Sequence, residues 1–319
     1  MTGVARMWRY RAGCCRLPHM PLATRQDPAM YRLWLFVVLI FVGVLPAAAN
    51  ERVPAYVIRV PAAIKTVFVA ETLAAKFHQF DNESGSPIEY RGSTYMSIGK
   101  SGDGKRRNGD RRTPLGIYFV TEQLDTSRLH EKYGITAFVL DYPNVLDRRR
   151  QYTGDGIWVH GVDRRGGKRP PRDTDGCIAL PNESLAMLED RFAANRTPVI
   201  VTRRLEWVDR DTLDTIGREL ETAVAEWAES QRQGDLHTFL SLYHDDFRHW
   251  GMNTQEWLAF QAETLNSRRL IEVTVSDLLL LADPVEAGTY LSRFTLRTVE
   301  DGRTTELTRR LYWRRAAGG

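Results

Sequence analysis

One cysteine and one histidine in this sequence have the spacing of a thiol nucleophile and its base. His160 ends an apolar, strand-like run, Gly161 follows it, and a basic loop returns the chain to Gly176 and Cys177. A free thiol has a pKa of about 8.5, so it needs a nearby imidazole to become a thiolate at neutral pH. Histidine can take that proton and later give it to a leaving amine. We therefore predict that Cys177 is a nucleophile and His160 its general base.

The residues before the cysteine suggest how a substrate is held. Gly176 allows a tight turn, and the main-chain amides of Gly176 and Cys177 are predicted to form an oxyanion hole. Basic side chains of the preceding loop are suited to binding carboxylates. The predicted substrate-binding residues are Thr174, Asp175, Arg172 and Arg164.

The first 49 residues have the pattern of an export signal. Arg32 precedes an apolar run over 33–45, and three alanines at 47–49 follow. The run is shorter than the roughly 20 residues that a membrane-spanning helix needs. Residues 1–49 are therefore predicted to be a signal peptide, cleaved after Ala49, or an uncleaved N-terminal anchor. Either reading places the rest of the chain in the periplasm or otherwise outside the cytoplasm.

Export makes the cysteine count informative. Cys14 and Cys15 precede the apolar run, so the exported portion keeps Cys177 alone. A lone thiol in an oxidising compartment has no intramolecular disulfide partner. This favours a chemical role for Cys177.

The net charge of +4 at pH 7 does not indicate a nucleic-acid partner. Residues 1–49 hold six arginines and one acid, and the remaining 38 basic and 39 acidic residues nearly balance. The basic clusters carry no interleaved aromatic residues. His244 and His249 are five apart, which does not align them on one helix face, so no metal is expected. We expect no cofactor, and membrane contact only through an uncleaved N-terminal segment; the oligomeric state stays open.

The pattern of apolar residues changes along the chain. Residues 64–204 contain short apolar runs separated by Gly, Asn and Pro turns, with one helix over 182–194, which predicts a mainly β domain. A proline-containing linker is expected at 50–63.

The second part begins with an amphipathic pattern. Over 211–231 apolar residues recur at steps of three and four, which predicts a helix. Two shorter helices and three strands should follow, the strands over 270–281, 288–299 and 304–313. The sequence therefore predicts a mainly β domain followed by a smaller α+β cone over 211–315, with the boundary near 204–212.

The stretch 156–182 resembles the signature of the YkuD-type L,D-transpeptidase family. That signature is His-Gly, a loop of about a dozen residues, then Ser or Thr, any residue, Gly-Cys and an apolar residue. The matching positions are His160, Gly161, Thr174, Gly176, Cys177 and Ile178. Blocks at 99–120, 142–147 and 153–161 also match one branch, so the resemblance covers roughly 64–203. Ala179 stands where many members carry Arg or Asn.

The resemblance implies a fold and a reaction. The fold would be the L,D-transpeptidase-like β-sandwich, and the partners would be peptidoglycan stem peptides. The cysteine would attack the amide between the L-centre of diaminopimelate and the terminal D-alanine. The main-chain carbonyl of Gly161 would hold the histidine, which makes Gly161 a third catalytic member.

Residues 211–314 resemble, more weakly, the nuclear transport factor 2-like cone. An appended cone of this kind is similar to the architecture of cell-shape L,D-carboxypeptidases in the same family. Three functions therefore remain open: a transpeptidase that joins stem peptides in cell-wall biogenesis, a carboxypeptidase that trims tetrapeptides to tripeptides, and a non-catalytic wall-binding protein.

Overall fold

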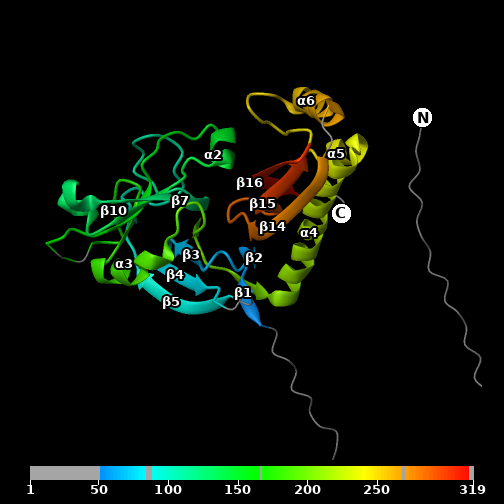
Figure 1. Ribbon diagram of the computed structural model, residues 1–319. Helices are drawn as coiled ribbons and strands as arrows, with labels where there is room; N and C mark the ends of the chain where they lie inside the picture. The colour runs from blue at the N-terminus through cyan, green and yellow to red at the C-terminus, as the bar shows by residue number, and fades with distance from the viewer. Residues whose placement is uncertain (1–50, 84–87, 166, 168, 268–269, 316–319) are drawn as a thin grey trace, which may run out of the picture. The chain divides into compact units, whose positions relative to one another are not determined.

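The computed structural model describes residues 51–83, 88–165, 167, 169–267 and 270–315 (Figure 1). The expected signal or anchor at 1–49 lies outside these described residues. These described residues form one compact unit. Among the described residues, no helix is both long and apolar enough to cross a membrane.

An eight-stranded sheet organises the first part of the unit, in the order β11-β9-β8-β7-β12-β3-β4-β5. Three of these strands form an antiparallel meander, β3-β4-β5, whereas the pairs β12/β3 and β11/β9 are parallel. The strands are β3 (Thr66–Glu71), β4 (Lys76–Asp81), β5 (Glu89–Tyr95), β7 (Gly116–Leu124), β8 (Ala137–Leu140), β9 (Trp158–Gly161), β11 (Ile178–Leu180) and β12 (Pro198–Thr202). The prediction of a mainly β domain is confirmed.

Both faces of this sheet are buried, as strand β3 shows. Phe68 and Ala70 belong to one apolar cluster, and their neighbours Val67 and Val69 belong to another. Alternate residues of a strand point to opposite faces, so each cluster covers one face. Helix α3 (Asn182–Leu188) contributes Leu185 and Leu188 to the first cluster. The expected helix over 182–194 is therefore shorter, because its end tightens into a 3₁₀ turn over Glu189–Arg191.

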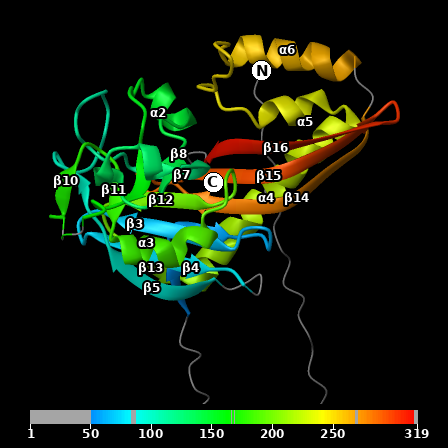
Figure 2. The same ribbon diagram turned by 60° about the vertical axis from the view of Figure 1, so that its left-hand side comes forward.

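The second part contains helices followed by long strands (Figure 2). Helix α4 buries Leu213, Leu220, Val224 and Trp227 along one side and ends at Gly234, which has the left-handed φ of +69° that favours glycine there. The elements are α4 (Arg210–Gln233), α5 (Leu236–Ser241), α6 (Thr254–Ser267), β14 (Leu270–Ala282), β15 (Thr289–Glu300) and β16 (Arg303–Arg314). The expected order of helices and strands is confirmed.

The stretch 50–63, expected to be a linker, is instead built into two sheets. Strand β1 (Arg52–Pro54) pairs with β13 (Trp207–Asp209), and β2 (Val57–Arg59) extends the C-terminal sheet to the order β16-β15-β14-β2. Strands of three residues show no measurable alternation, and their partners lie more than 150 residues away. The linker prediction was therefore wrong, because strands this short show no repeating pattern and their pairing is decided by distant residues.

The two parts share an apolar core. Leu279, Leu281 and Leu291 of the C-terminal sheet lie in the same cluster as Val69 and Phe119 of the large sheet. All five side chains are essentially excluded from solvent. Helix α4 begins at Arg210, and apolar packing continues across this change from strands to helices.

Candidate active site

Strands β9 and β11 bring the predicted nucleophile and base to one face of the sheet. They pair in parallel, with Ile178 beside Val159 and Ala179 beside His160. Val159 and Ile178 belong to the apolar core, and Cys177 directly precedes β11. Alternation along the two chains is therefore expected to place the side chains of His160 and Cys177 on the opposite face. One strand across and two residues along place their Cα atoms about 8 Å apart. Two side chains of this length can bridge that separation.

The Cys177 thiol is half-buried and protonated at rest. Its Sγ donates to the carbonyl oxygen of Gly156 at 3.4 Å. Burial raises the pKa of the thiol, while the positive charges of Lys132 and Arg169 act in the opposite direction. A base must therefore remove the proton before the sulfur can attack.

His160 is the neutral base that this thiol requires. Its ring is 2% exposed, and its Nδ1 lies 2.6 Å from the carbonyl oxygen of Gly161. A carbonyl only accepts, so Nδ1 carries the hydrogen and Nε2 keeps its lone pair. Burial lowers the pKa of His160 to about 4, with smaller contributions from Arg169 and Lys132, against the opposing effect of the Gly161 hydrogen bond. The carbonyl contact is the one that the resemblance implies for Gly161.

Two threonines hold the turn before Cys177. Thr174 Oγ1 accepts from the Gly176 amide at 3.1 Å and donates to the Cys177 carbonyl at 2.7 Å. Thr113 Oγ1 donates to the Gly176 carbonyl at 2.9 Å and accepts from the Gly99 amide at 2.9 Å. The Gly176 amide, expected in the oxyanion hole, is thus occupied, which leaves the Cys177 amide as the candidate donor. Thr174 is buried in this turn and supports it.

The other expected substrate-binding residues lie around this turn. Arg172 is exposed on β10 (Arg172–Thr174), which pairs with β6 (Ile98–Gly99). Asp175 is exposed, 3.6 Å from the ammonium of Lys100. Arg164 instead donates to two backbone carbonyls, those of Gly134 and Thr126. The Arg164 guanidinium therefore stabilises the backbone of the 126–134 segment, whereas Arg172 and Asp175 are exposed to solvent.

The structure adds an aromatic and cationic wall that was not predicted. The ring of Tyr133 lies 4.9 Å from that of Trp158 and 5.3 Å, edge to face, from that of His160. The ammonium of Lys132 lies 5.0 Å from the centre of the Tyr133 ring. Two-residue alternation along β9 could have placed Trp158 beside His160. Lys132 and Tyr133 come from a short 3₁₀ turn (Glu131–Tyr133) and gave no sequence signal.

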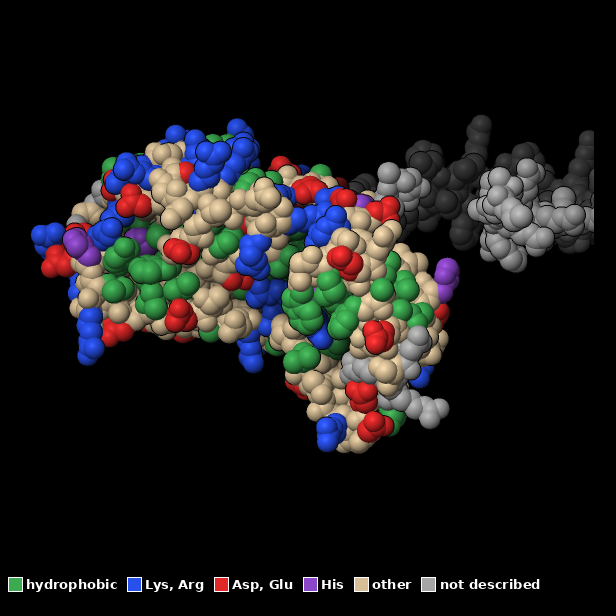
Figure 3. All heavy atoms as spheres, turned by 90° about the horizontal axis from the view of Figure 1, so that it is seen from above, with side chains coloured by type: hydrophobic (Ala, Val, Ile, Leu, Met, Phe, Trp, Pro, Cys, Tyr) green, Lys and Arg blue, Asp and Glu red, His purple; other side chains and the backbone are tan. Residues whose placement is uncertain are grey.

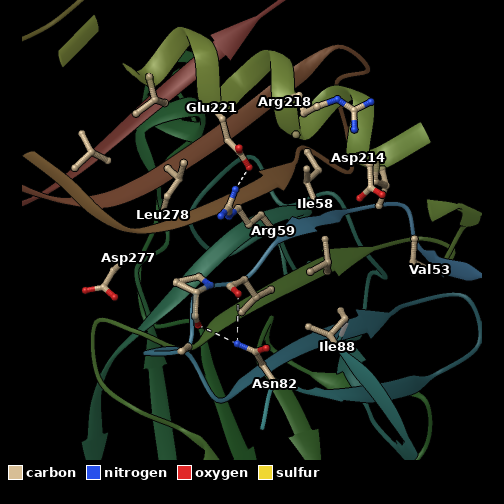
Figure 4. Close-up of a pocket in the computed structure, with 18 of the residues that line it drawn as sticks. Val53, Ile58, Arg59, Asn82, Ile88, Asp214, Arg218, Glu221, Asp277 and Leu278 are labelled. Carbon is tan, nitrogen blue, oxygen red and sulfur yellow. Dashed lines mark hydrogen bonds and ion pairs between the residues drawn. The ribbon is translucent and has the colours of Figure 1, made fainter. Parts of the chain in front are cut away.

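A separate cavity lies away from this site. A cavity of about 750 Å³ opens between β2, α4 and β14, where Arg59 forms an ion pair with Glu221 and Asn82 donates to backbone carbonyls (Figure 4). Neither Cys177 nor His160 lines it. Figure 3 shows Lys and Arg side chains gathered along one edge of the lobe that holds the large sheet. The candidate site is therefore identified by the chemistry of Cys177 and His160, because neither residue lines this cavity.

Comparisons with known proteins identify a family for part of the chain and two similar folds. Residues 79–201 match the YkuD family, the L,D-transpeptidase catalytic domain. The fold is similar to that of Bd1075 from Bdellovibrio bacteriovorus, with a TM-score of 0.69, 22% identity, and coverage of 84% of this chain and 95% of that chain. It is also similar to the helical cell shape determining protein Pgp2 from Campylobacter jejuni, with a TM-score of 0.66, 21% identity, and coverage of 88% and 93%. A comparison with curated proteins gave no match. Residues 79–201 of this chain are thus an L,D-transpeptidase catalytic domain of the YkuD family.

Proposed function

We propose that the chain is a peptidoglycan L,D-transpeptidase that uses a Cys177 acyl-enzyme. The observation that carries the proposal is the state of His160, a buried, neutral imidazole whose Nδ1 hydrogen is held by Gly161. The parallel pairing of β9 with β11 supports a placement of its free Nε2 lone pair on the side of Cys177. This is the arrangement that a thiol nucleophile needs.

The reaction follows from these groups. His160 Nε2 takes the thiol proton while Sγ attacks the carbonyl carbon of the L-centre of diaminopimelate, and the Cys177 amide donates to the oxyanion. When the C–N bond breaks, His160 gives its proton to the departing D-alanine amine, which leaves a thioester on Cys177. An acceptor amine then attacks the thioester, loses a proton to His160 and releases the thiol. The product is a new amide crosslink.

Water in place of the acceptor amine gives the second candidate, an L,D-carboxypeptidase that trims tetrapeptides to tripeptides. The support for this candidate is the architecture, because an appended cone resembles that of cell-shape L,D-carboxypeptidases, and the fold similarity to the cell shape determining protein Pgp2 extends beyond residues 79–201. Residues 211–315 are proposed to be a nuclear transport factor 2-like cone, which the order of helices followed by antiparallel strands supports. The same chemistry serves both outcomes.

The proposed substrate also sets the location. Peptidoglycan stem peptides lie outside the cytoplasm, and the apolar run at 33–45 with its following alanines supports export. We propose that the working protein is periplasmic or otherwise extracytoplasmic.

Product analysis tests the proposal. Purified protein is incubated with disaccharide-tetrapeptides, and the products are separated by mass. Crosslinked dimers are expected; tripeptide monomers would select the carboxypeptidase; bound but unchanged substrate would indicate a wall-binding protein.

Two variants serve as controls for the mechanism. Cys177→Ala should abolish turnover and labelling by a thiol probe while leaving the circular dichroism spectrum unchanged. His160→Gln should retain the thiol but lose turnover by at least a hundredfold. Turnover that persists in Cys177→Ala would end the proposed mechanism.

A further inference from the structure

Lys132 carries a positive charge that acts on both the nucleophile and its base. It is half-buried, its ammonium packs over Tyr133, and that ring contacts His160 edge to face. Within the described parts of the chain, Lys132 forms no ion pair. A partly desolvated ammonium favours an anion at close range.

Arg169 places a second cation at the same position. Its side chain is only 15% exposed and lies 3.7 Å from Asp173, and its Nη2 is 3.5 Å from the Lys132 carbonyl oxygen. Tyr95 fixes the backbone there by donating to the Arg169 carbonyl at 2.7 Å. Lys132 and Arg169 come from segments that lie far apart in the sequence, and both act electrostatically on His160. Asp173 balances one of the two charges, so the pair keeps a net positive charge.

The chemistry of the leaving group points to the anion. The departing nitrogen must reach His160 Nε2 to receive its proton. The free carboxylate of the terminal residue is bonded to the same Cα, so its oxygens lie within about 3 Å of that nitrogen. The carboxylate is therefore on the His160 side of the scissile bond, where the two cations are.

We propose that Lys132 and Arg169 bind the free carboxylate of the terminal D-residue and so select stem peptides that end at the scissile bond. This inference rests on the proposed function, and it holds for either fate of the acyl-enzyme because the leaving group is the same. The proposal does not include the neighbouring arginines Arg164 and Arg172. Arg164 is occupied by backbone carbonyls, and Arg172 is exposed on β10.

Binding to an inactive protein tests the proposal directly. Cys177→Ala protein is titrated calorimetrically with a tetrapeptide that ends in D-Ala and with the same peptide ending in D-Ala carboxamide. The carboxylate peptide should bind at least tenfold more tightly. Adding Lys132→Gln or Arg169→Gln should weaken binding of the carboxylate peptide by about tenfold and leave the carboxamide unchanged. Equal weakening of both peptides would overturn the proposal, because a merely structural role moves both.

Control variants at other positions test whether the effect on binding depends on the location of the removed positive charge. Lys76→Gln removes an exposed lysine on β4, and Arg165→Gln removes an exposed arginine that is paired with Asp163 and Glu131. Neither should change the preference for the carboxylate. Lys132→Arg keeps the cation and should retain the preference, so a loss in that variant would count against a charge-based role.

Kinetics with the catalytic chain distinguish this inference from the function on which it rests. If wild-type protein turns over both peptides equally well, the carboxylate proposal fails while the cysteine mechanism stands. If wild-type protein prefers the carboxylate in binding but turns over neither peptide, the proposed reaction fails while the carboxylate site stands. The expected result is a raised KM with little change in kcat for Lys132→Gln, seen only with the carboxylate peptide.

Discussion

The hydrogen bond between His160 and Gly161 decides which ring nitrogen can act as a base. Because the Gly161 carbonyl holds the Nδ1 hydrogen, the lone pair must reside on Nε2. Burial raises the pKa of Cys177 and lowers that of His160. The resting site is therefore a neutral thiol and a neutral imidazole, and the proton moves when substrate is attacked.

The acid side of the pH profile should reflect this state. Protonation of Nε2 removes the lone pair, so kcat/KM should fall as pH falls through about 4, well below the 6.5 of a free imidazole. Turnover of tetrapeptide measured from pH 3 to 8 checks it. An acid limb centred near 6.5 would contradict a buried, neutral base.

The fold must be followed in the same titration. The unfolded chain takes up a proton on this histidine near pH 6.5, whereas the folded chain does so near 4. The stability contributed at neutral pH, about 3 kcal/mol, is lost as pH falls across that window. Circular dichroism at each pH separates loss of the fold from protonation of the base.

Gly176 is a position where only glycine fits. Its φ is +134°, and a Cβ there would lie 2.9 Å from the Arg112 carbonyl oxygen. Gly176→Ala should cost about 1–3 kcal/mol of unfolding free energy and lower turnover, because the turn that presents Cys177 must shift. Urea unfolding and product assays measure both effects.

Gly104 offers a matched comparison for this substitution. It also has a positive φ, +79°, but nothing lies within 4 Å of its added Cβ. Gly104→Ala should therefore cost less stability and leave turnover nearly unchanged. Equal effects of the two substitutions would show that the close approach at Gly176 does not matter.

The turn between β10 and β11 depends on a hydroxyl from another segment. Thr113 is fully buried and bridges the Gly176 carbonyl and the Gly99 amide. Thr113→Val keeps the shape but leaves both backbone groups unpaired, which should cost about 1–3 kcal/mol and reduce turnover. Thr222→Val, at an exposed position of α4, is the control and should change stability by less than about 0.5 kcal/mol. Urea midpoints and turnover are measured for both variants. If Thr113→Val changed neither stability nor turnover, the turn would not depend on the Thr113 hydroxyl.

Long elements were predictable because their patterns repeat. The three C-terminal strands and helix α4 were placed within two residues, since each has ten or more residues of alternating or helical pattern. Strands β1, β2 and β13 were missed, because three residues carry no period and their pairing is decided by distant partners. The expected linker at 50–63 failed for that reason.

The candidate site shows the same division. Cys177 and His160 could be singled out because a motif keeps them close along the chain. Lys132 and Tyr133 lie almost thirty residues before His160, and only the folded sheet brings their turn to it. The Gly176 amide was expected to face substrate, but it donates to the hydroxyl of Thr174, two residues earlier in the chain. The identities of the residues alone do not predict whether a backbone amide donates to a nearby side chain or stays available to substrate.

Across the whole molecule, the catalytic sheet and the C-terminal sheet depend on one another. Leu279, Leu281 and Leu291 complete the apolar layer beneath β3, β7 and β12. Arg310 of β16 lies 4.0 Å over the ring of Phe119 and forms an ion pair with Asp141, whose other oxygen accepts from the Phe119 amide. The contacts of Arg310 therefore add to the apolar packing between the two sheets at β7. We expect residues 50–315 to unfold in a single transition.

Leu281→Ala tests this coupling, because Leu281 is fully buried between the two sheets. The cavity should cost about 3 kcal/mol. The loss should appear equally in both halves, as faster amide hydrogen exchange in the strands at 64–204 and in helix α4. Leu307→Ala, which truncates a side chain 46% exposed on β16, should leave exchange in both halves unchanged. If Leu281→Ala accelerated exchange only in the C-terminal elements, the two parts would be separate folding units. Cys177 would then keep its environment without the appended sheet.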